Sequence, residues 1–108
     1  MDYYRTGEDI LDCITIKGSK LNGSIVVPPS KSICYRAIIA SGLSEGICDI
    51  KNIVLSDDIM ATIGGMEALG SKISVNGNGL IVKGSSPPKA VRKEIDCMDS
   101  ASTLRFLI

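Results

Sequence analysis

The sequence predicts an α+β fold built on a β-α-β-α-β-β unit. Short apolar runs rich in β-branched residues alternate with two segments of helical periodicity, and an Asn-Gly-Asn-Gly turn at 76–79 separates the last two runs. The β-α order begins again after residue 92, so we expect one complete unit and the start of a second. Residues 104–108 are apolar apart from Arg105 and have no glycine exit, and we therefore expect the chain to be a truncated piece of a longer protein.

The apolar runs define the expected strands. Residues 13–17 alternate in a way that suits a short strand. Residues 25–27 form a second run, which stops at Pro28-Pro29 because proline cannot donate a hydrogen bond to a sheet ladder. The other expected strands follow in order at 48–55, 73–75, 80–82 and 92–97.

Two complete helices and the beginning of a third are expected. Apolar residues recur at helical spacing over 32–43. A second helix is expected over 56–69, since Ser56-Asp57-Asp58 offers a hydroxyl cap and two first-turn carboxylates. Adjacent carboxylates on a helix do not face each other, so capping is favoured over acid-base chemistry for this pair. The third helix is expected to open at Ser100.

The composition excludes several function classes. The 108 residues carry 12 Lys and Arg against 12 Asp and Glu, so no overall field draws nucleic acid or an anionic membrane, and an anion must be bound locally. There is no histidine and the four cysteines form no CxxC pair, so we expect no metal site and interpret the cysteines as small buried thiols. Without a membrane-spanning run or a basic-then-apolar leader, the sequence predicts a cytoplasmic protein.

One candidate anion site lies where the 25–27 run gives way to the first helix. The free N–H groups of the first turn meet the Ser32 hydroxyl, the Lys31 ammonium and, one turn later on the same face, the Arg36 guanidinium. Cations there oppose the helix dipole at a cost of about 0.3–1 kcal/mol each, which a bound anion would reverse. The alternative, equally supported by the residues, is that Ser30 or Ser32 only caps the helix while both cations point into solvent.

A second polar turn precedes the third helix over residues 97–105. Asp99, Ser100 and Ser102 lie in it and Arg105 follows, which is compatible with another anion cradle. Taken alone, this turn is better interpreted as the start of an ordinary capped helix.

These segments together resemble a known family. The stretch Pro28-Pro29-Ser30-Lys31-Ser32, followed by Arg36, resembles the signature of the 5-enolpyruvylshikimate-3-phosphate (EPSP) synthases. The Pro-Ser-Lys-Ser core is specific, since the related UDP-N-acetylglucosamine enolpyruvyl transferases lack it. Further matches stand in family order and extend the resemblance over roughly 14–108: Ala37-Ile38-Ile39-Ala40, Asn52 with Ser56-Asp57-Asp58, Leu69-Gly70 and Thr103-Leu104-Arg105-Phe106-Leu107.

The resemblance implies an activity and a fold. The family transfers the enolpyruvyl group of phosphoenolpyruvate to the 5-hydroxyl of shikimate 3-phosphate through a tetrahedral intermediate and releases phosphate, with no metal or organic cofactor. The enolpyruvyl transferase fold, an inverse alpha-beta barrel, has two similar domains of β-α-β-α-β-β units. Residues 1–22 would be an N-terminal segment and strand associated with the other domain, and residues 23–108 would be part of the first domain of a monomeric parent enzyme.

The resemblance also implies roles for individual residues. The shikimate 3-phosphate ligands would be Lys31, Ser32 and Arg36. The residues at phosphoenolpyruvate would be Lys31 again, Asp99, Ala101 and Ser102, with Arg105 as a further candidate. The family's other charged site residues are not in this chain, so the fragment alone is expected to be inactive.

The chain departs from the family pattern at the second turn and in the first helix. Where the family has Asn-(Ala or Ser)-Gly-Thr, this chain has Asp99-Ser100-Ala101-Ser102, which adds a carboxylate and a methyl group beside an anionic ligand; Tyr35 replaces a His or Asn. Two alternatives stay open: an inactive homologue that retains only shikimate 3-phosphate affinity, and a non-catalytic anion- or RNA-binding module of the same fold. Neutral charge and few aromatic residues argue against nucleic acid.

Overall fold

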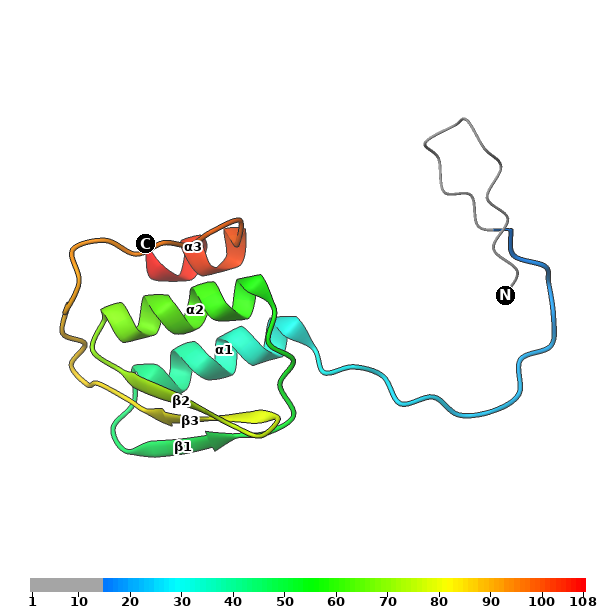
Figure 1. Cartoon of the computed structure of the whole chain (residues 1–108), viewed down its shortest axis with the longest axis horizontal. Coiled ribbons are helices and arrows are strands. Elements are labelled where there is room, and N and C mark those ends of the chain that lie inside the picture. The colour runs from blue at the N-terminus through cyan, green and yellow to red at the C-terminus, as the bar shows by residue number, and fades with distance from the viewer. Residues whose placement is uncertain (1–14) are drawn as a thin grey trace.

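The computed structural model describes residues 15–108, which form an α+β arrangement of three helices and one sheet (Figure 1). Helices α1 and α2 pack on the sheet, and α3 packs against α2. The elements follow in the order α1 (Lys31–Gly42), β1 (Ile47–Ile50), α2 (Asp57–Ala68), β2 (Lys72–Asn76), β3 (Gly79–Lys83) and α3 (Ala101–Leu107).

The sheet has three antiparallel strands in the order β1-β3-β2. Strands β2 and β3 form the predicted hairpin, with Asn76 opposite Gly79 and Gly77 in the turn at a φ of 59°. Glycine adopts this left-handed conformation without steric cost, which explains the Asn-Gly-Asn-Gly sequence. The predicted hairpin is therefore confirmed.

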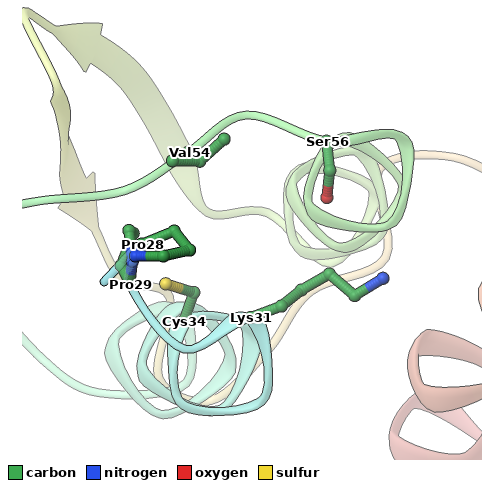
Figure 2. Close-up of a pocket in the computed structure, with 6 residues that line it drawn as sticks. All are labelled: Pro28, Pro29, Lys31, Cys34, Val54 and Ser56. Carbon is green, nitrogen blue, oxygen red and sulfur yellow. The ribbon is translucent and has the colours of Figure 1, made fainter. Parts of the chain in front are cut away.

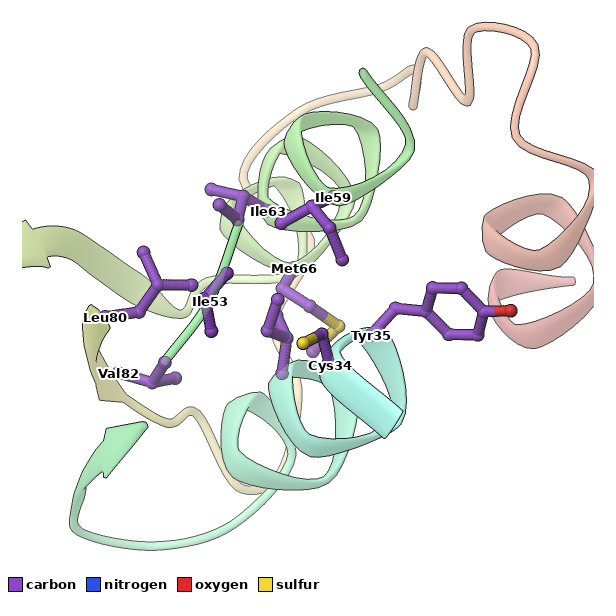
Figure 3. Close-up of a cluster of buried hydrophobic side chains, with 9 residues drawn as sticks. Cys34, Tyr35, Ile53, Ile59, Ile63, Met66, Leu80 and Val82 are labelled. Atoms are coloured by element: carbon purple, nitrogen blue, oxygen red, sulfur yellow. The ribbon is translucent and has the colours of Figure 1, made fainter. Parts of the chain in front are cut away.

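The core lies between one face of the sheet and the helices (Figure 3). Leu80 and Val82 point to the same face of β3 because side chains alternate along a strand, and both are fully buried. Ile38 of α1 and Ile59 and Met66 of α2 are equally buried against them. This periodicity follows the helical and strand spacing of the sequence, so the two predicted helices are confirmed, with each boundary shifted by one residue.

The prediction of a strand at 25–27 is wrong. These residues form no strand, and the exposed fractions of Ile25 and Val26 are 87% and 101%. An apolar run becomes a strand only when another strand accepts its backbone hydrogen bonds, and none among residues 15–108 lies alongside it. In the predicted strand at 13–17, residues 13 and 14 lie outside the described residues and 15–17 form no strand.

Two other strand predictions are corrected. The run at 48–55 is a strand only as far as Ile50; the chain then turns at Asn52, whose φ is 58°, and Ile53 donates its backbone N–H to the Asn78 carbonyl at 2.7 Å. The segment 92–97 is a loop, because the chain before it is tied to the carboxyl end of α2 instead of to the sheet. There Val91 N–H donates to the Ala68 carbonyl at 2.8 Å.

The cysteines are free thiols in the described part of the chain. Cys34 is buried, while Cys48 and Cys97 are half-buried. The interpretation of small buried thiols is confirmed for Cys34 and holds only partly for the other two. Cys13 lies outside the described residues.

Candidate functional site

The three helices begin at the same end of the molecule (Figure 1). Each starts at a serine whose hydroxyl accepts a backbone N–H from three residues further on: Ser30, Ser56 and Ser100. The predicted cap at Ser56 and the predicted helix start at Ser100 are thereby confirmed, and Ser30 rather than Ser32 caps α1. The unpaired first-turn N–H groups of α1 and α2 therefore face this end, where the helix dipoles favour negative charge.

Lys31, the first residue of α1, reaches across to α2. Its ammonium forms a hydrogen-bonded ion pair with the carboxylate of Asp58, in the first turn of α2. The hydrogen bond to Asp58 and then the charge of Asp58 raise the pKa of Lys31 above its ordinary value, so the side chain is a cation at neutral pH. Sequence reasoning treated Asp58 only as a capping carboxylate and missed this pairing across 27 positions.

Arg36 lies on the same face as Ser32, as its spacing predicts. Its guanidinium donates to the Ser32 carbonyl at 2.7 Å. It also lies over two aromatic rings, 5.7 Å from the centroid of Tyr35 and 5.4 Å from that of Phe106. These contacts hold an exposed cation in place through cation–π attraction, and the hydrogen bond to Ser32 uses one of its five N–H donors.

Tyr35 connects the two predicted anion sites. Its hydroxyl lies 3.3 Å from the Ser32 hydroxyl on α1 and 3.0 Å from the Ser102 hydroxyl on α3. The hydrogen bond with Ser102 and then that with Ser32 lower the pKa of Tyr35; the charges of Arg36 and Lys31 act in the same direction, and burial opposes them. The structure thus brings together two serines that are 70 positions apart in the sequence.

Buried hydroxyls pin the second turn to α2. Thr103 shares hydrogen bonds of 2.7 Å with Ser100 and 2.8 Å with Thr62, and Thr62 donates to the Asp58 carbonyl at 2.9 Å. The Thr103 hydroxyl also lies 3.5 Å from the Asp58 carbonyl, and the Asp58 carboxylate holds Lys31, so Asp58 contacts both the start of α1 and the start of α3.

The remaining predicted site residues lie on the surface of this turn and of α3. Asp99, Ala101 and Arg105 are exposed. Within residues 15–108, no hydrogen bond or ion pair joins their side chains to Lys31, Ser32 or Ser102. Four predicted residues, Lys31, Ser32, Arg36 and Ser102, thus lie close together around Tyr35. Asp99, Ala101 and Arg105 lie on the neighbouring surface.

A small hollow opens between the starts of α1 and α2 (Figure 2). Its volume is about 150 Å³, and it is lined by Pro28, Pro29, Lys31, Cys34, Val54 and Ser56. Ligand pockets usually measure about 300–1,000 Å³, so this hollow is too small to enclose a drug-sized molecule. Of the candidate anion-site residues, Lys31 lines this hollow, while Ser32 and Arg36 are exposed.

Two other features of the described residues bear on function. Over residues 15–108, no group of three or more His, Cys, Asp or Glu side chains is placed to hold a metal ion. None of the helices in that same range has the length and apolar character needed to cross a membrane.

Known proteins resemble this chain over most of its length. Residues 15–108 match the family model described as EPSP synthase (3-phosphoshikimate 1-carboxyvinyltransferase). A curated relative named 3-phosphoshikimate 1-carboxyvinyltransferase, from Clostridium novyi (strain NT), is 50% identical over 108 aligned residues. The alignment covers 91% of this chain and 25% of the relative.

Two more relatives carry the same name. The protein from Clostridium perfringens (strain SM101 / Type A) is 49% identical over 96 residues, covering 88% of this chain and 23% of the relative. The protein from Clostridium kluyveri is 42% identical over 95 residues, covering 88% and 22%. The chain thus spans about a quarter of the length of these relatives. Because the family model matches residues 15–108 of the 108 residues, this chain belongs to the EPSP synthase (3-phosphoshikimate 1-carboxyvinyltransferase) family.

Proposed function

We propose that this chain is the N-terminal part of a longer enzyme, here called the parent enzyme, that transfers the enolpyruvyl group of phosphoenolpyruvate to the 5-hydroxyl of shikimate 3-phosphate and releases phosphate. The observation that carries the proposal is the contact between the two predicted anion sites. The Ser-Lys-Ser start of α1 meets the first turn of α3 through Tyr35. Family membership supports the same reaction.

The charges in the site suit two polyanionic substrates. Lys31 and Arg36 supply cations beside the free N–H groups at the start of α1, and such groups bind phosphate and carboxylate oxygens. Preorganised cations also stabilise the negative charge that develops while the phosphate group leaves. The Lys31 ammonium is paired with the Asp58 carboxylate, so a bound anion must share it with that carboxylate or replace it.

We assign the residues to the two substrates as follows. Shikimate 3-phosphate is bound by Lys31, Ser32 and Arg36. Phosphoenolpyruvate is bound by Lys31 and Ser102, next to Asp99 and Ala101, and Arg105 is an additional contact. No metal or organic cofactor takes part, and the parent enzyme is a cytoplasmic monomer in which residues 1–22 associate with the other domain. The isolated chain lacks the rest of the site and is inactive.

One observation favours a second candidate, an inactive homologue that binds only shikimate 3-phosphate. Asp99 is exposed at the turn assigned to phosphoenolpyruvate, where its carboxylate would repel an anionic ligand. A non-catalytic RNA-binding module is the less favoured alternative, because Tyr35 is buried and the net charge is zero.

The test is phosphate release by the parent enzyme with both substrates present, together with the affinity for each ligand measured by calorimetry. We expect Lys31→Ala to weaken both ligands. Ser56→Ala, the control at the neighbouring helix start, should mainly lower the free energy of unfolding, by about 1 kcal/mol as for a lost cap.

Failure to bind either ligand at millimolar concentrations would show the proposed activity to be wrong. Binding of shikimate 3-phosphate alone, without turnover, would select the inactive homologue. Unchanged affinities in Lys31→Ala would reduce the Ser-Lys-Ser segment to a helix cap.

A further inference from the structure

We propose that Tyr35 is a positioning residue that couples the two substrate half-sites, because its hydroxyl forces Ser32 and Ser102 to share one outward hydrogen-bond donor. The inference rests on the proposed function, which assigns Ser32 to shikimate 3-phosphate and Ser102 to phosphoenolpyruvate. From the sequence, Tyr35 was only a departure from the family pattern, and no role was predicted for its hydroxyl.

The three hydroxyls form a chain with Tyr35 in the middle. The Tyr35 oxygen lies 3.3 Å from that of Ser32 and 3.0 Å from that of Ser102, and either atom can be the donor in each contact. The ring is held firmly: only 7% of Tyr35 is exposed, and its centroid lies 6.1 Å from that of Phe106. The Tyr35 hydroxyl therefore cannot move away from its two partners without displacing the ring from the core.

Counting the protons gives the consequence. Each hydroxyl carries one proton that it can donate, and the two internal hydrogen bonds use two of the three. The third proton is left on Ser32, on Ser102, or on Tyr35 when both serines donate to it, so at most one of the two serines can donate to a ligand while both internal hydrogen bonds are kept. Both proposed substrates present acceptor-only phosphate and carboxylate oxygens, so each needs a donor. When both are bound, one internal hydrogen bond must break.

Through Tyr35, binding of one substrate therefore weakens the binding of the other by about the free energy of one neutral hydrogen bond. Such a bond corresponds to roughly a fivefold change in affinity. The buried ring transmits the effect without any movement of the backbone, because the change lies in which oxygen donates. Arg36, which lies over the ring, keeps its own hydrogen bond to the Ser32 carbonyl in either arrangement.

The experiment compares the parent enzyme with its Tyr35→Phe variant, which loses the hydroxyl and keeps the ring. Initial rates over a grid of both substrate concentrations give the factor by which one bound substrate changes the affinity for the other. In Tyr35→Phe we expect the affinity for one substrate, measured with the other bound, to be about fivefold higher relative to its affinity alone than in the unaltered enzyme. The thermal midpoint should change little, since the packing of the ring is retained.

Ser71→Ala is the matched control. The Ser71 hydroxyl is buried and donates to the Gly42 carbonyl at 2.8 Å, at the opposite end of α1. This variant also loses one buried hydroxyl hydrogen bond, so it should lower stability while leaving the coupling factor unchanged.

Three other outcomes would contradict either the role of Tyr35 or the proposed function. An unchanged coupling factor in Tyr35→Phe, in a parent enzyme that turns over both substrates, would refute the role of Tyr35 and leave the proposed function intact. An equal shift in Ser71→Ala would attribute the effect to general loosening and refute it as well. Absence of turnover in the unaltered parent enzyme would overturn the proposed function, and this inference with it.

Discussion

The hydroxyls of Thr62 and Thr103 lie 2.8 Å apart in the buried interface between α2 and α3, where both residues are fully buried. This pair fixes the turn that carries Ser102 against the helix that carries Asp58. The two candidate half-sites are thus positioned by a contact that is itself out of reach of any ligand.

Thr62→Val should destabilise the chain. The substitution keeps the shape of the side chain but removes the hydrogen bonds of Thr62 to Thr103 and to the Asp58 carbonyl, while Thr103 keeps Ser100 as a partner. Each lost hydrogen bond costs about 0.5–1.5 kcal/mol. The double variant Thr62→Val/Thr103→Val should lose less than the sum of the single variants, because both partners are then apolar. Thermal and denaturant unfolding of the four proteins provide the measurement. Additive losses would show that the two hydroxyls do not interact.

Asp58→Asn should lower the pKa of Lys31 toward the ordinary value of 10.5, because the hydrogen bond to Asp58 and its charge are the main causes of the raised pKa. A raised pKa in the folded state stabilises the protein below pH 10.5, and this contribution disappears as the pH rises through the folded-state pKa. NMR titration of the Lys31 side-chain nitrogen gives the pKa directly. If the Lys31 pKa is the same in both proteins, the ion pair does not exist in solution.

Tyr35 should ionise below the ordinary pKa of 10.0. Ser102→Ala should raise its pKa more than Ser32→Ala does, since the hydrogen bond with Ser102 is the largest cause of the shift. A lowered pKa favours the ionised form in the folded state, so folding gains stability as the pH rises from the folded-state pKa to about 10.0. The titration is followed by ultraviolet absorbance, with Tyr35→Phe subtracted to remove the other tyrosines. The opposite order of the two serine variants would contradict the contact at 3.0 Å.

Ala101 should reduce the sensitivity of the parent enzyme to glyphosate. The family resemblance implies that glyphosate occupies the phosphoenolpyruvate position next to a glycine, and here an exposed Ala101 methyl group stands at that position. One methyl-sized change supplies about 1–3 kcal/mol of discrimination, so Ala101→Gly should restore inhibition. The inhibition constant of each protein is compared with its own affinity for phosphoenolpyruvate. Equal ratios in both would show that Ala101 lies away from the ligand.

Local signals predicted much of the fold. Ser56 and Ser100 begin helices where their hydroxyls can cap backbone N–H groups, and Gly77 lies in the turn of the predicted hairpin. The Pro-Ser-Lys-Ser stretch also predicted the family, which the match over residues 15–108 confirms. These features depend on residues at most a few positions apart, so the sequence by itself determined them.

Other features were decided only by the tertiary structure, because they depend on which distant segment supplies the partner. The run at 25–27 has the composition of a strand but lies beside no other strand among residues 15–108, and so it remains outside the sheet and exposed. Lys31 finds its partner on α2, and Tyr35 finds Ser102 on α3. Hydrogen bonds and ion pairs act over a few ångströms in space, and it is the packing of α1, α2 and α3 side by side that brings residues so distant in the sequence within that range.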